Sequence, residues 1–258
     1  MKIFGILNIT PDSFSDGNIY MSPQNAAAQA KKMLAEGAFA VDVGAESTRP
    51  GAFAITPGEE WERLSAVMKE LGNISLSIDT RNPATAEKAL LYNNVKYLND
   101  VSGFNNLEMV KLAAAAKVNI IVMHSLSVPV DKNITLTSPP VETLTGWIGR
   151  KFEVLSKSGI TPEKIIFDPG IGFGKTPEQS REIIARAGEL AGICHKLGTK
   201  ILYGHSRKSF LGGDIASRDF ETAKITAYLQ TKAVDFVRVH NVQANLDMIS
   251  NAAKIEME

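Results

Sequence analysis

Eight short hydrophobic segments alternate along the chain with longer segments of helical character. The hydrophobic segments are Ile3–Ile9, Phe39–Val43, Ile74–Ile78, Val95–Leu98, Val118–Met123, Lys164–Phe167, Lys200–Tyr203 and Val234–Val239. They are continuously apolar rather than alternating, which is typical of strands that are covered on both faces. Eight strand–helix units in 258 residues predict an α/β fold of the (β/α)8 TIM-barrel type, with a doubly wound open sheet as the alternative.

The segments between the strands begin with explicit helix start signals. Thr56 is followed by Pro57 and, three residues after the cap, by Glu59, which is the pattern of a capping box. Thr176 is followed by proline in the same way, and so are Ser22 and Asn82. No Ser/Gly linker or charge block interrupts the chain. We therefore expect a single domain over residues 1–258.

Polar or charged residues follow nearly every predicted strand. They are Asn8, Glu46-Ser-Thr-Arg49, Asp79, Asn99-Asp100, His124, Asp168, His205-Ser-Arg-Lys208 and Arg238-Val-His240. A polar residue at a strand end is often only a helix cap, but capping does not explain arginine and lysine, because positive charge is disfavoured at a helix N-terminus. In a closed barrel all of these ends meet at one rim, where barrel active sites are built. This distribution favours the barrel over the open sheet.

The chemistry of these residues indicates a substrate with two different parts. Asp79, Asn99 and Asp168 can hydrogen-bond a flat heterocycle that is rich in donors and acceptors. Arg49, Lys208, Arg238 and His240 suit an anion, and arginine offers a planar fork to phosphate. Another lysine, Lys175, directly precedes the helix cap Thr176, and we expect it to be a solvated loop charge.

Composition excludes several classes of function. The chain has 28 basic and 28 acidic residues and a formal net charge of zero, which argues against a broad nucleic-acid footprint. The apolar start of the chain is too short for a signal peptide or a membrane span, and one cysteine, Cys194, fits a reducing compartment. The histidines at 124, 205 and 240 are too scattered for a zinc motif. We expect a soluble cytoplasmic protein that binds neither nucleic acid nor membrane.

Seven segments together resemble dihydropteroate synthase, in the order of that family and over nearly the whole chain. They are Gly5–Gly17, Asp42–Gly51, Ser77–Thr80, Leu98–Gly103, Asp168–Lys175, Ser206–Ser209 and Arg238–His240. The resemblance implies a TIM barrel that joins 4-aminobenzoate to (7,8-dihydropterin-6-yl)methyl diphosphate. Its products are dihydropteroate and pyrophosphate, in the step of folate biosynthesis that sulfonamides block. It also implies Mg²⁺ as the cofactor and a homodimer.

The resemblance assigns roles residue by residue. It implies that the pterin is bound by Asp79, Asn99, Asp168 and Lys208. It implies that the diphosphate is bound by Asn8, Thr48, Arg49, Arg238 and His240, with Asn8 also contacting the metal. It implies that the aminobenzoate site is shaped by Phe14, Pro50, Phe173 and Ser206. The catalytic residues among these are Asp79, Lys208, Arg49, Arg238 and His240.

Some positions depart from the family's usual residues. Asn18 replaces a glycine, Asn241 replaces the aspartate that usually follows Arg-Val-His, and Ser125–Pro129 replaces the common Met-x-Gly-x-Pro stretch. Two alternatives remain open. One is a related pterin-binding barrel of the methyltetrahydrofolate-binding type, and the other is a family member with weak or lost activity.

Overall fold

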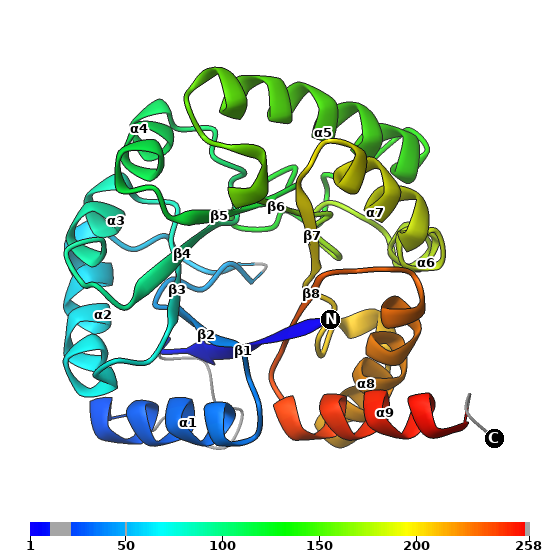
Figure 1. Ribbon diagram of the computed structural model, residues 1–258, viewed down its shortest axis with the longest axis horizontal. Helices are drawn as coiled ribbons and strands as arrows, with labels where there is room; N and C mark the ends of the chain where they lie inside the picture. Colours follow the sequence, from blue (N-terminus) through cyan, green and yellow to red (C-terminus); the bar gives the residue numbers. More distant parts are fainter. Residues whose placement is uncertain (11–21, 50, 256–258) are drawn as a thin grey trace.

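The described residues form a closed barrel of parallel strands, as the sequence predicts (Figure 1). The computed structural model describes residues 1–10, 22–49 and 51–255. The strands pair in chain order and are β1 (Lys2–Asn8), β2 (Ala40–Gly44), β3 (Leu76–Asp79), β4 (Val95–Asp100), β5 (Asn119–Met123), β6 (Ile165–Asp168), β7 (Lys200–Tyr203) and β8 (Phe236–Val239). Parallel pairing of β1 with β8 closes the barrel, so the open-sheet alternative is excluded.

Helices follow the strands and surround the barrel (Figure 1). They are α1 (Pro23–Ala35), α2 (Pro57–Leu71), α3 (Pro83–Ala89), α4 (Leu107–Ala116), α5 (Pro140–Lys157), α6 (Pro177–Ala185), α7 (Ala187–Lys196), α8 (Ile215–Thr231) and α9 (Val242–Ile255). Two 3-10 turns, Pro162–Lys164 and Ser209–Leu211, precede β6 and α8. Because each strand is covered by helices outside and by side chains inside, it reads as a continuous apolar run.

Most helices begin at the residues that the start signals indicate. The Thr56 hydroxyl accepts a hydrogen bond from the Glu59 amide at 3.2 Å, and the Glu59 carboxylate accepts from the Thr56 amide at 2.8 Å. Thr176 and Gln179 form the same reciprocal pair at the start of α6. Such caps satisfy amides that the first helical turn leaves without partners. Asn82 is the exception, because its side chain donates to a buried glutamate of α2 instead of capping α3.

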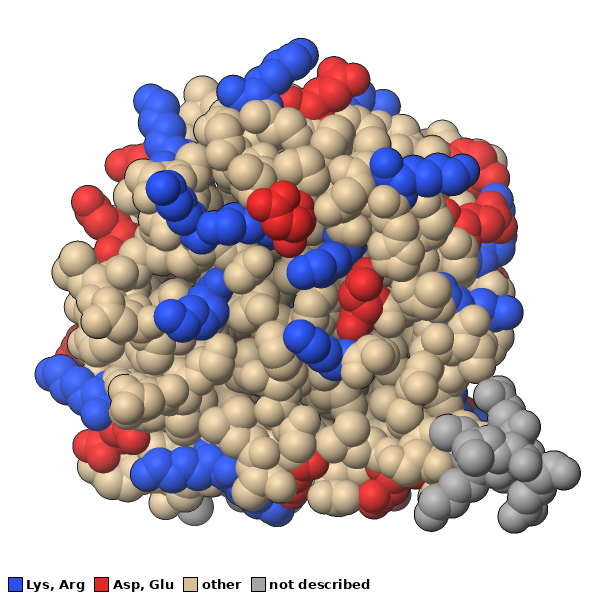
Figure 2. All heavy atoms as spheres, in the orientation of Figure 1, with Lys and Arg blue, Asp and Glu red and all other residues tan. Residues whose placement is uncertain are grey.

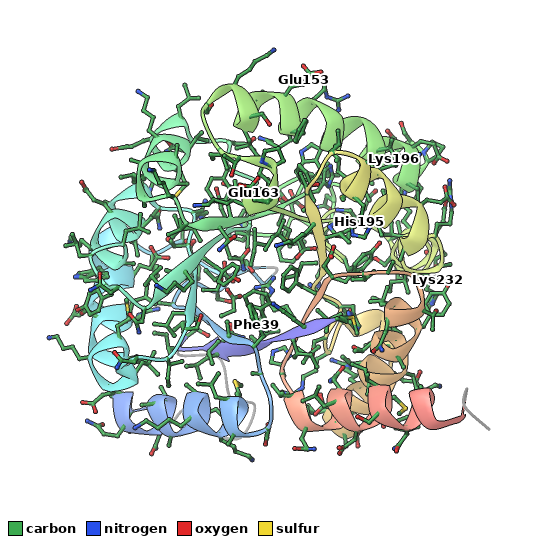
Figure 3. All side chains as sticks on the ribbon, viewed as in Figure 1. Phe39, Glu153, Glu163, His195, Lys196 and Lys232 are labelled. Carbon is green, nitrogen blue, oxygen red and sulfur yellow. The ribbon has the colours of Figure 1, made fainter. Side chains whose placement is uncertain are left out.

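The barrel interior is built in layers, with an apolar layer at the floor, where the strands begin. This layer consists of Phe4, Ala40, Tyr97, Ile121, Ile166, Leu202 and Phe236. The Phe4 ring makes edge contacts with Tyr97 at 5.0 Å and with Phe236 at 5.5 Å between centroids. Phe39, which is labelled in Figure 3, packs against the same rings, and the Lys2 ammonium lies 4.1 Å from its centroid. Aromatic rings therefore close the floor.

The next interior layer toward the carboxyl end is polar. Side chains of a strand point inward at every second residue, so the position two residues after each floor residue faces the next layer. That step leads from Ala40 to Asp42, from Tyr97 to Asn99, from Ile166 to Asp168 and from Phe236 to Arg238. The register continues the layer to Asp79, which pairs with Gly44 on one side and Asn99 on the other. The fold thus gathers side chains from five strands at the carboxyl end of the barrel.

On the face of the molecule that Figure 2 shows, in the orientation of Figure 1, side chains of both charge signs are interspersed. This face shows no large patch of a single sign. None of the helices in the described part of the chain is long and apolar enough to cross a membrane.

Candidate active site

The Arg238 guanidinium lies among three carboxylates at the carboxyl end of the barrel. Its Nη1 donates to Asp42 Oδ2 at 2.7 Å and to Asp79 Oδ2 at 3.1 Å, and its Nη2 lies 4.0 Å from Asp168 Oδ2. The Arg238 side chain is 11% exposed. Burial alone would lower the pKa of Arg238. The charges of Asp42 and Asp79 outweigh that effect and raise the pKa above its usual value. A permanent positive charge therefore stands at the centre of this cluster.

Asp42 is a site residue that the sequence reasoning missed. Its Oδ2 accepts hydrogen bonds from both Arg238 and Asn99 Nδ2, the latter at 3.0 Å. The signal that could have identified it is an aspartate inside an otherwise apolar strand, because a buried charge in a strand requires a partner. Asp42 connects β2 to β4 and β8 and fixes the orientation of the Asn99 amide.

The Asp79 carboxyl at the end of β3 holds its proton more tightly than an ordinary aspartate. Burial, followed by the negative charge of Asp42, raises the pKa of Asp79 to about 8, and Arg238 opposes the rise. The side chain remains 21% exposed, so it can be reached from the barrel opening. At neutral pH the free protein therefore keeps this carboxyl largely protonated.

The loop after β6 turns sharply over Asp168. The Asp168 Oδ1 accepts a hydrogen bond from the Gly170 amide at 2.8 Å, and burial raises the pKa of this 1% exposed carboxyl. Gly170 has a φ of +66°, and a Cβ there would lie 1.9 Å from the His124 carbonyl oxygen. Only glycine fits a position that combines a left-handed backbone with such close approach. The sharp turn thereby holds Oδ1 of Asp168, while Oδ2 lies buried on the side of Arg238.

Lys208, which follows β7, reaches over this loop. Its Nζ lies 4.4 Å from the centroid of the Phe173 ring, and its stem passes over Gly172. Burial and the nearby Arg238 lower the pKa of Lys208 to about 8, while Asp168 opposes that change. The structure thus brings Asp168, Arg238 and Lys208 into electrostatic contact.

Four buried polar atoms of these residues have no hydrogen-bond partner within the described chain. They are Asp42 Oδ1, Asn99 Oδ1, Asp168 Oδ2 and Arg238 Nε. A buried polar atom without a partner costs about 1–3 kcal/mol, and a site that binds a polar ligand supplies the missing partners. Beside them Gly204 has no side chain, and a Cβ there would lie within 3.4 Å of both Asp168 and Arg238. Three acceptors and one donor are therefore available to a ligand.

A second polar group joins the loops after β7 and β8. Ser206 Oγ accepts from the His240 amide at 3.2 Å and lies 2.9 Å from His240 Nδ1. The hydroxyl and Nδ1 therefore share one hydrogen bond, whose direction depends on which ring nitrogen carries the proton. Burial, and next the charge of Arg207, lowers the pKa of His240 to about 3. This imidazole is therefore uncharged at neutral pH.

A carboxylate lies beside His240 and the asparagine that follows it. Asn241 Nδ2 donates to Asp219 Oδ2 of α8 at 3.3 Å. The same Asp219 makes two hydrogen bonds with Arg207, at 2.6 and 2.8 Å. Residue 241 carries no charge, and the carboxylate that acts on His240 is that of Asp219.

Three predicted anion-binding residues lie on the first two strand–helix connections. Asn8 is half-buried at the end of β1, Thr48 is half-buried and Arg49 is exposed. The loop after β2, which carries Thr48 and Arg49, is anchored by Arg81. This arginine makes two hydrogen bonds of 2.8 Å with Glu46. The Thr48 carbonyl also accepts from the Val130 amide at 3.3 Å. Two predicted aminobenzoate residues, Phe14 and Pro50, lie outside the described residues.

The expectation that Lys175 is a solvated loop charge is wrong. Lys175 is 7% exposed, and its Nζ lies 2.9 Å from the Phe173 carbonyl oxygen, 3.0 Å from His124 Nδ1 and 3.3 Å from the His124 carbonyl oxygen. Its position directly before a helix cap suggested exposure, but the preceding turn directs the side chain inward.

Two predicted rim histidines face the outer layer rather than the cluster. His205 is fully buried against α8, where its Nε2 lies 3.1 Å from both the Thr222 carbonyl oxygen and Thr226 Oγ1. The His124 ring makes an edge contact with Trp147 of α5 at 5.1 Å. Among the described residues no group of three His, Cys, Asp or Glu side chains could hold a metal ion.

Residues 4–240 match the family described as "Pterin binding enzyme". A folate synthesis bifunctional protein of Chlamydia muridarum is 36% identical over 98% of this chain, and the chain spans only 59% of that protein's length. A dihydropteroate synthase of Neisseria meningitidis is 36% identical over 96% of this chain and 90% of its own length.

Two solved structures share the fold over nearly the whole chain. Dihydropteroate synthase from Anaplasma phagocytophilum, with bound 6-hydroxymethylpterin-monophosphate, has a TM-score of 0.87 at 36% identity and covers 98% of each chain. Dihydropteroate synthase from Thermus thermophilus, in complex with 4-aminobenzoate, has a TM-score of 0.83 at 31% identity and covers 98% of this chain and 94% of its own.

Proposed function

Because this chain belongs to the pterin-binding enzymes, and among them to the dihydropteroate synthases, we propose that it joins 4-aminobenzoate to (7,8-dihydropterin-6-yl)methyl diphosphate. The products are 7,8-dihydropteroate and pyrophosphate. The relatives with these ligands in their structures support both substrate classes.

The set of unpartnered polar atoms at the carboxyl end of the barrel is the observation on which this proposal rests. Asp42, Asn99 and Asp168 each have a free buried acceptor, and Arg238 has a free buried donor. A pterin is flat, with ring and exocyclic N–H donors beside a carbonyl acceptor, so it would satisfy both kinds of atom at once. An apolar substrate would leave all four unsatisfied, at a cost of about 1–3 kcal/mol each.

Asp79 would act on the charge that develops during the reaction. Departure of diphosphate leaves positive charge on the pterin methylene and ring. A nearby positive charge lowers the pKa of a carboxyl, so Asp79 would lose its proton to water through its 21% exposed side chain and face the cation as a carboxylate. This interaction is stronger in the transition state than in the ground state, which is the condition for lowering a barrier. The Asp79–Arg238 hydrogen bond of 3.1 Å holds the carboxyl in place.

The diphosphate would lie on the side of Thr48, Arg49 and His240, where the uncharged His240 ring can donate a hydrogen bond when its proton is on Nε2. We infer that Mg²⁺ would be bound here, because it prefers oxygen ligands, keeps several waters and is usually held by one or two protein groups together with substrate phosphates. Asn8 offers one such amide oxygen at the end of β1. When bound, the metal neutralises charge on the leaving group.

4-Aminobenzoate would enter beside Phe173 and Ser206. Ser206 is held by His240 through two hydrogen-bond contacts, so the aminobenzoate side and the diphosphate side share one anchored pair. Phe14 and Pro50 complete this proposal from outside the described residues. The aromatic amine is nucleophilic without an added base, and we infer a dissociative substitution with no covalent enzyme intermediate.

The experiment that tests this function is turnover of both substrates with Mg²⁺, followed by pyrophosphate release and mass detection of dihydropteroate. Asn99→Leu should abolish pterin binding. Lys196→Ala, a matched control on the exposed end of α7 at the barrel floor (Figure 3), should behave as the unaltered protein.

Each alternative gives a different result in this experiment. A pterin-binding barrel of the methyltetrahydrofolate-binding type would bind a pterin but release no pyrophosphate. A family member without activity would bind both substrates without product. Analytical ultracentrifugation and cell fractionation test the two remaining parts of the proposal, a homodimer and a cytoplasmic location, which rest on the family resemblance.

A further inference from the structure

The Lys175 ammonium is buried at a point where three acceptors converge. They are the Phe173 carbonyl oxygen at 2.9 Å, His124 Nδ1 at 3.0 Å and the His124 carbonyl oxygen at 3.3 Å. Burial lowers the pKa of this amine to about 7, while Asp168 opposes the change. In its ammonium form it has three N–H donors, which match these three acceptors. Burying a lysine costs free energy unless it is paired, and here backbone and ring atoms of two neighbouring loops offset that cost.

These contacts join the loop after β5 to the loop after β6. His124 follows β5 directly, and its amide extends the sheet by donating to the Asp168 carbonyl at 2.9 Å. Its ring is fixed by the edge contact with Trp147. The position of His124 is therefore fixed. Lys175 connects to it the end of the loop after β6, which contains Gly170, Gly172 and Gly174.

Phe173 is the residue of that loop whose carbonyl is held. Its side chain is 8% exposed and packs against Val101 and Met123 on one side. On the other side its ring lies under the Lys208 ammonium. The loop around Phe173 contains glycines with positive φ at 170, 172 and 174, so the backbone on both sides of Phe173 has little intrinsic preference for one conformation. The Phe173 amide donates to the Gly170 carbonyl at 3.1 Å and the Leu136 amide donates to the Gly174 carbonyl at 3.0 Å. The hydrogen bond from Lys175 is the side-chain restraint on the Phe173 carbonyl.

We propose that Lys175 is a positioning residue, which fixes Phe173 so that its ring forms one wall of the aminobenzoate site. The inference rests on the proposed function for the identity of that ligand. Lys175 itself touches no substrate and acts through Phe173. A methionine of similar length would fill the same volume but would leave both carbonyl oxygens and His124 Nδ1 without a donor.

The first test separates binding of the two substrates. In Lys175→Met we expect the KM for 4-aminobenzoate to rise by about tenfold or more, because a shift of about 1 Å at a site can cost 10²-fold in rate. The dissociation constant for the pterin diphosphate, measured by calorimetry, should change by less than about threefold. Lys175→Gln, whose side-chain amide keeps two of the three N–H donors, should lie between. Lys151→Met, which removes a half-buried lysine bonded to Asn105, should leave both constants unchanged.

A double-mutant cycle then tests whether the effect passes through Phe173. Residues that act as one unit give non-additive effects, so Lys175→Met should add little to the KM for 4-aminobenzoate in a Phe173→Ala background. The same change should be additive with Ser206→Ala, because Ser206 is anchored by His240 on the other side. Additivity with both partners would overturn the proposal, and so would an unchanged aminobenzoate KM in folded Lys175→Met.

Hydrogen exchange separates this inference from the proposed function. In the free protein, amides of residues 172–175 should exchange faster in Lys175→Met and Lys175→Gln than in the unaltered chain, with the β7 and β8 amides unchanged. If the unaltered protein forms no dihydropteroate, the proposed function fails while this result still supports the positioning role. Equal protection of these amides in all three proteins would refute the inference even in an active enzyme.

Discussion

Replacing Asp79 with asparagine should inactivate the protein and at the same time stabilise its fold. The raised pKa of about 8 means that the folded protein keeps a proton that an unfolded chain releases near pH 4. The free energy of unfolding therefore falls as the pH rises from about 4 to 8, because over that range the folded state binds more protons than the unfolded state.

The size of the stabilisation follows from that interval. Each pH unit lowers the free energy of unfolding by about 1.4 kcal/mol, so three units, from pH 4 to pH 7, give an upper limit of about 4 kcal/mol. The introduced asparagine does not titrate, and its amide oxygen can still accept from Arg238. After relaxation of the pocket we expect Asp79→Asn to unfold at pH 7 with about 1–3 kcal/mol more free energy than the unaltered protein.

The loss of activity has a separate cause. Asparagine cannot become an anion when positive charge appears on the pterin, so a charge-assisted interaction made chiefly in the transition state is lost. Such a loss costs about 2–4 kcal/mol, or two to three orders of magnitude in kcat. Binding of the uncharged pterin ring should change much less, because Asn99 and Asp168 remain.

Urea unfolding at pH 5, 7 and 8, combined with turnover at pH 8, measures both effects. The difference in free energy of unfolding between Asp79→Asn and the unaltered protein should grow from pH 5 to pH 8. The same measurement on Asp168→Asn is the comparison, because the carboxyl of that buried aspartate also accepts a hydrogen bond from the Gly170 amide. Turnover close to that of the unaltered enzyme would remove Asp79 from the mechanism. A stability difference that does not vary with pH would refute the argument from its pKa.

The same pocket supports three further predictions. The pH profile of kcat/KM for the pterin diphosphate should have its maximum near pH 8. Asp79 must be able to ionise, which limits activity on the acid side, and Lys208, with a pKa lowered to about 8, must stay protonated, which limits activity on the basic side. A flat profile between pH 6 and 9 would contradict this. Lys208→Ala should weaken pterin binding in calorimetry and slow turnover, and unchanged values for both would exclude its contact with the ring. Gly170→Ala should lower the free energy of unfolding by about 3 kcal/mol or more, because its Cβ would lie 1.9 Å from a backbone oxygen; a variant as stable as the parent in urea would show that the turn can relax.

The sequence by itself determined the strands, the closed barrel and most of the helix starts. Strand formation and capping depend on neighbours within a few residues, so Thr56 and Thr176 cap their helices as their spacing indicates. The carboxyl ends of parallel strands meet by topology, which is why polar residues that follow separate strands, such as Asp79 and Asp168, could be placed at one site. Strand starts and ends differ from the predicted ones by two residues or fewer.

Only the tertiary structure decided how these groups act on one another. Arg238 donates to carboxylates that lie 159 and 196 positions away in the chain, and the pKa of Asp79 follows from burial and from Asp42, neither of which a local pattern specifies. Lys175 reads as a solvated charge in the sequence, yet the turn after β6 directs it to three acceptors. Local propensity sets where a backbone segment begins and ends, whereas the protonation and orientation of a buried side chain depend on atoms that only the closed barrel brings together.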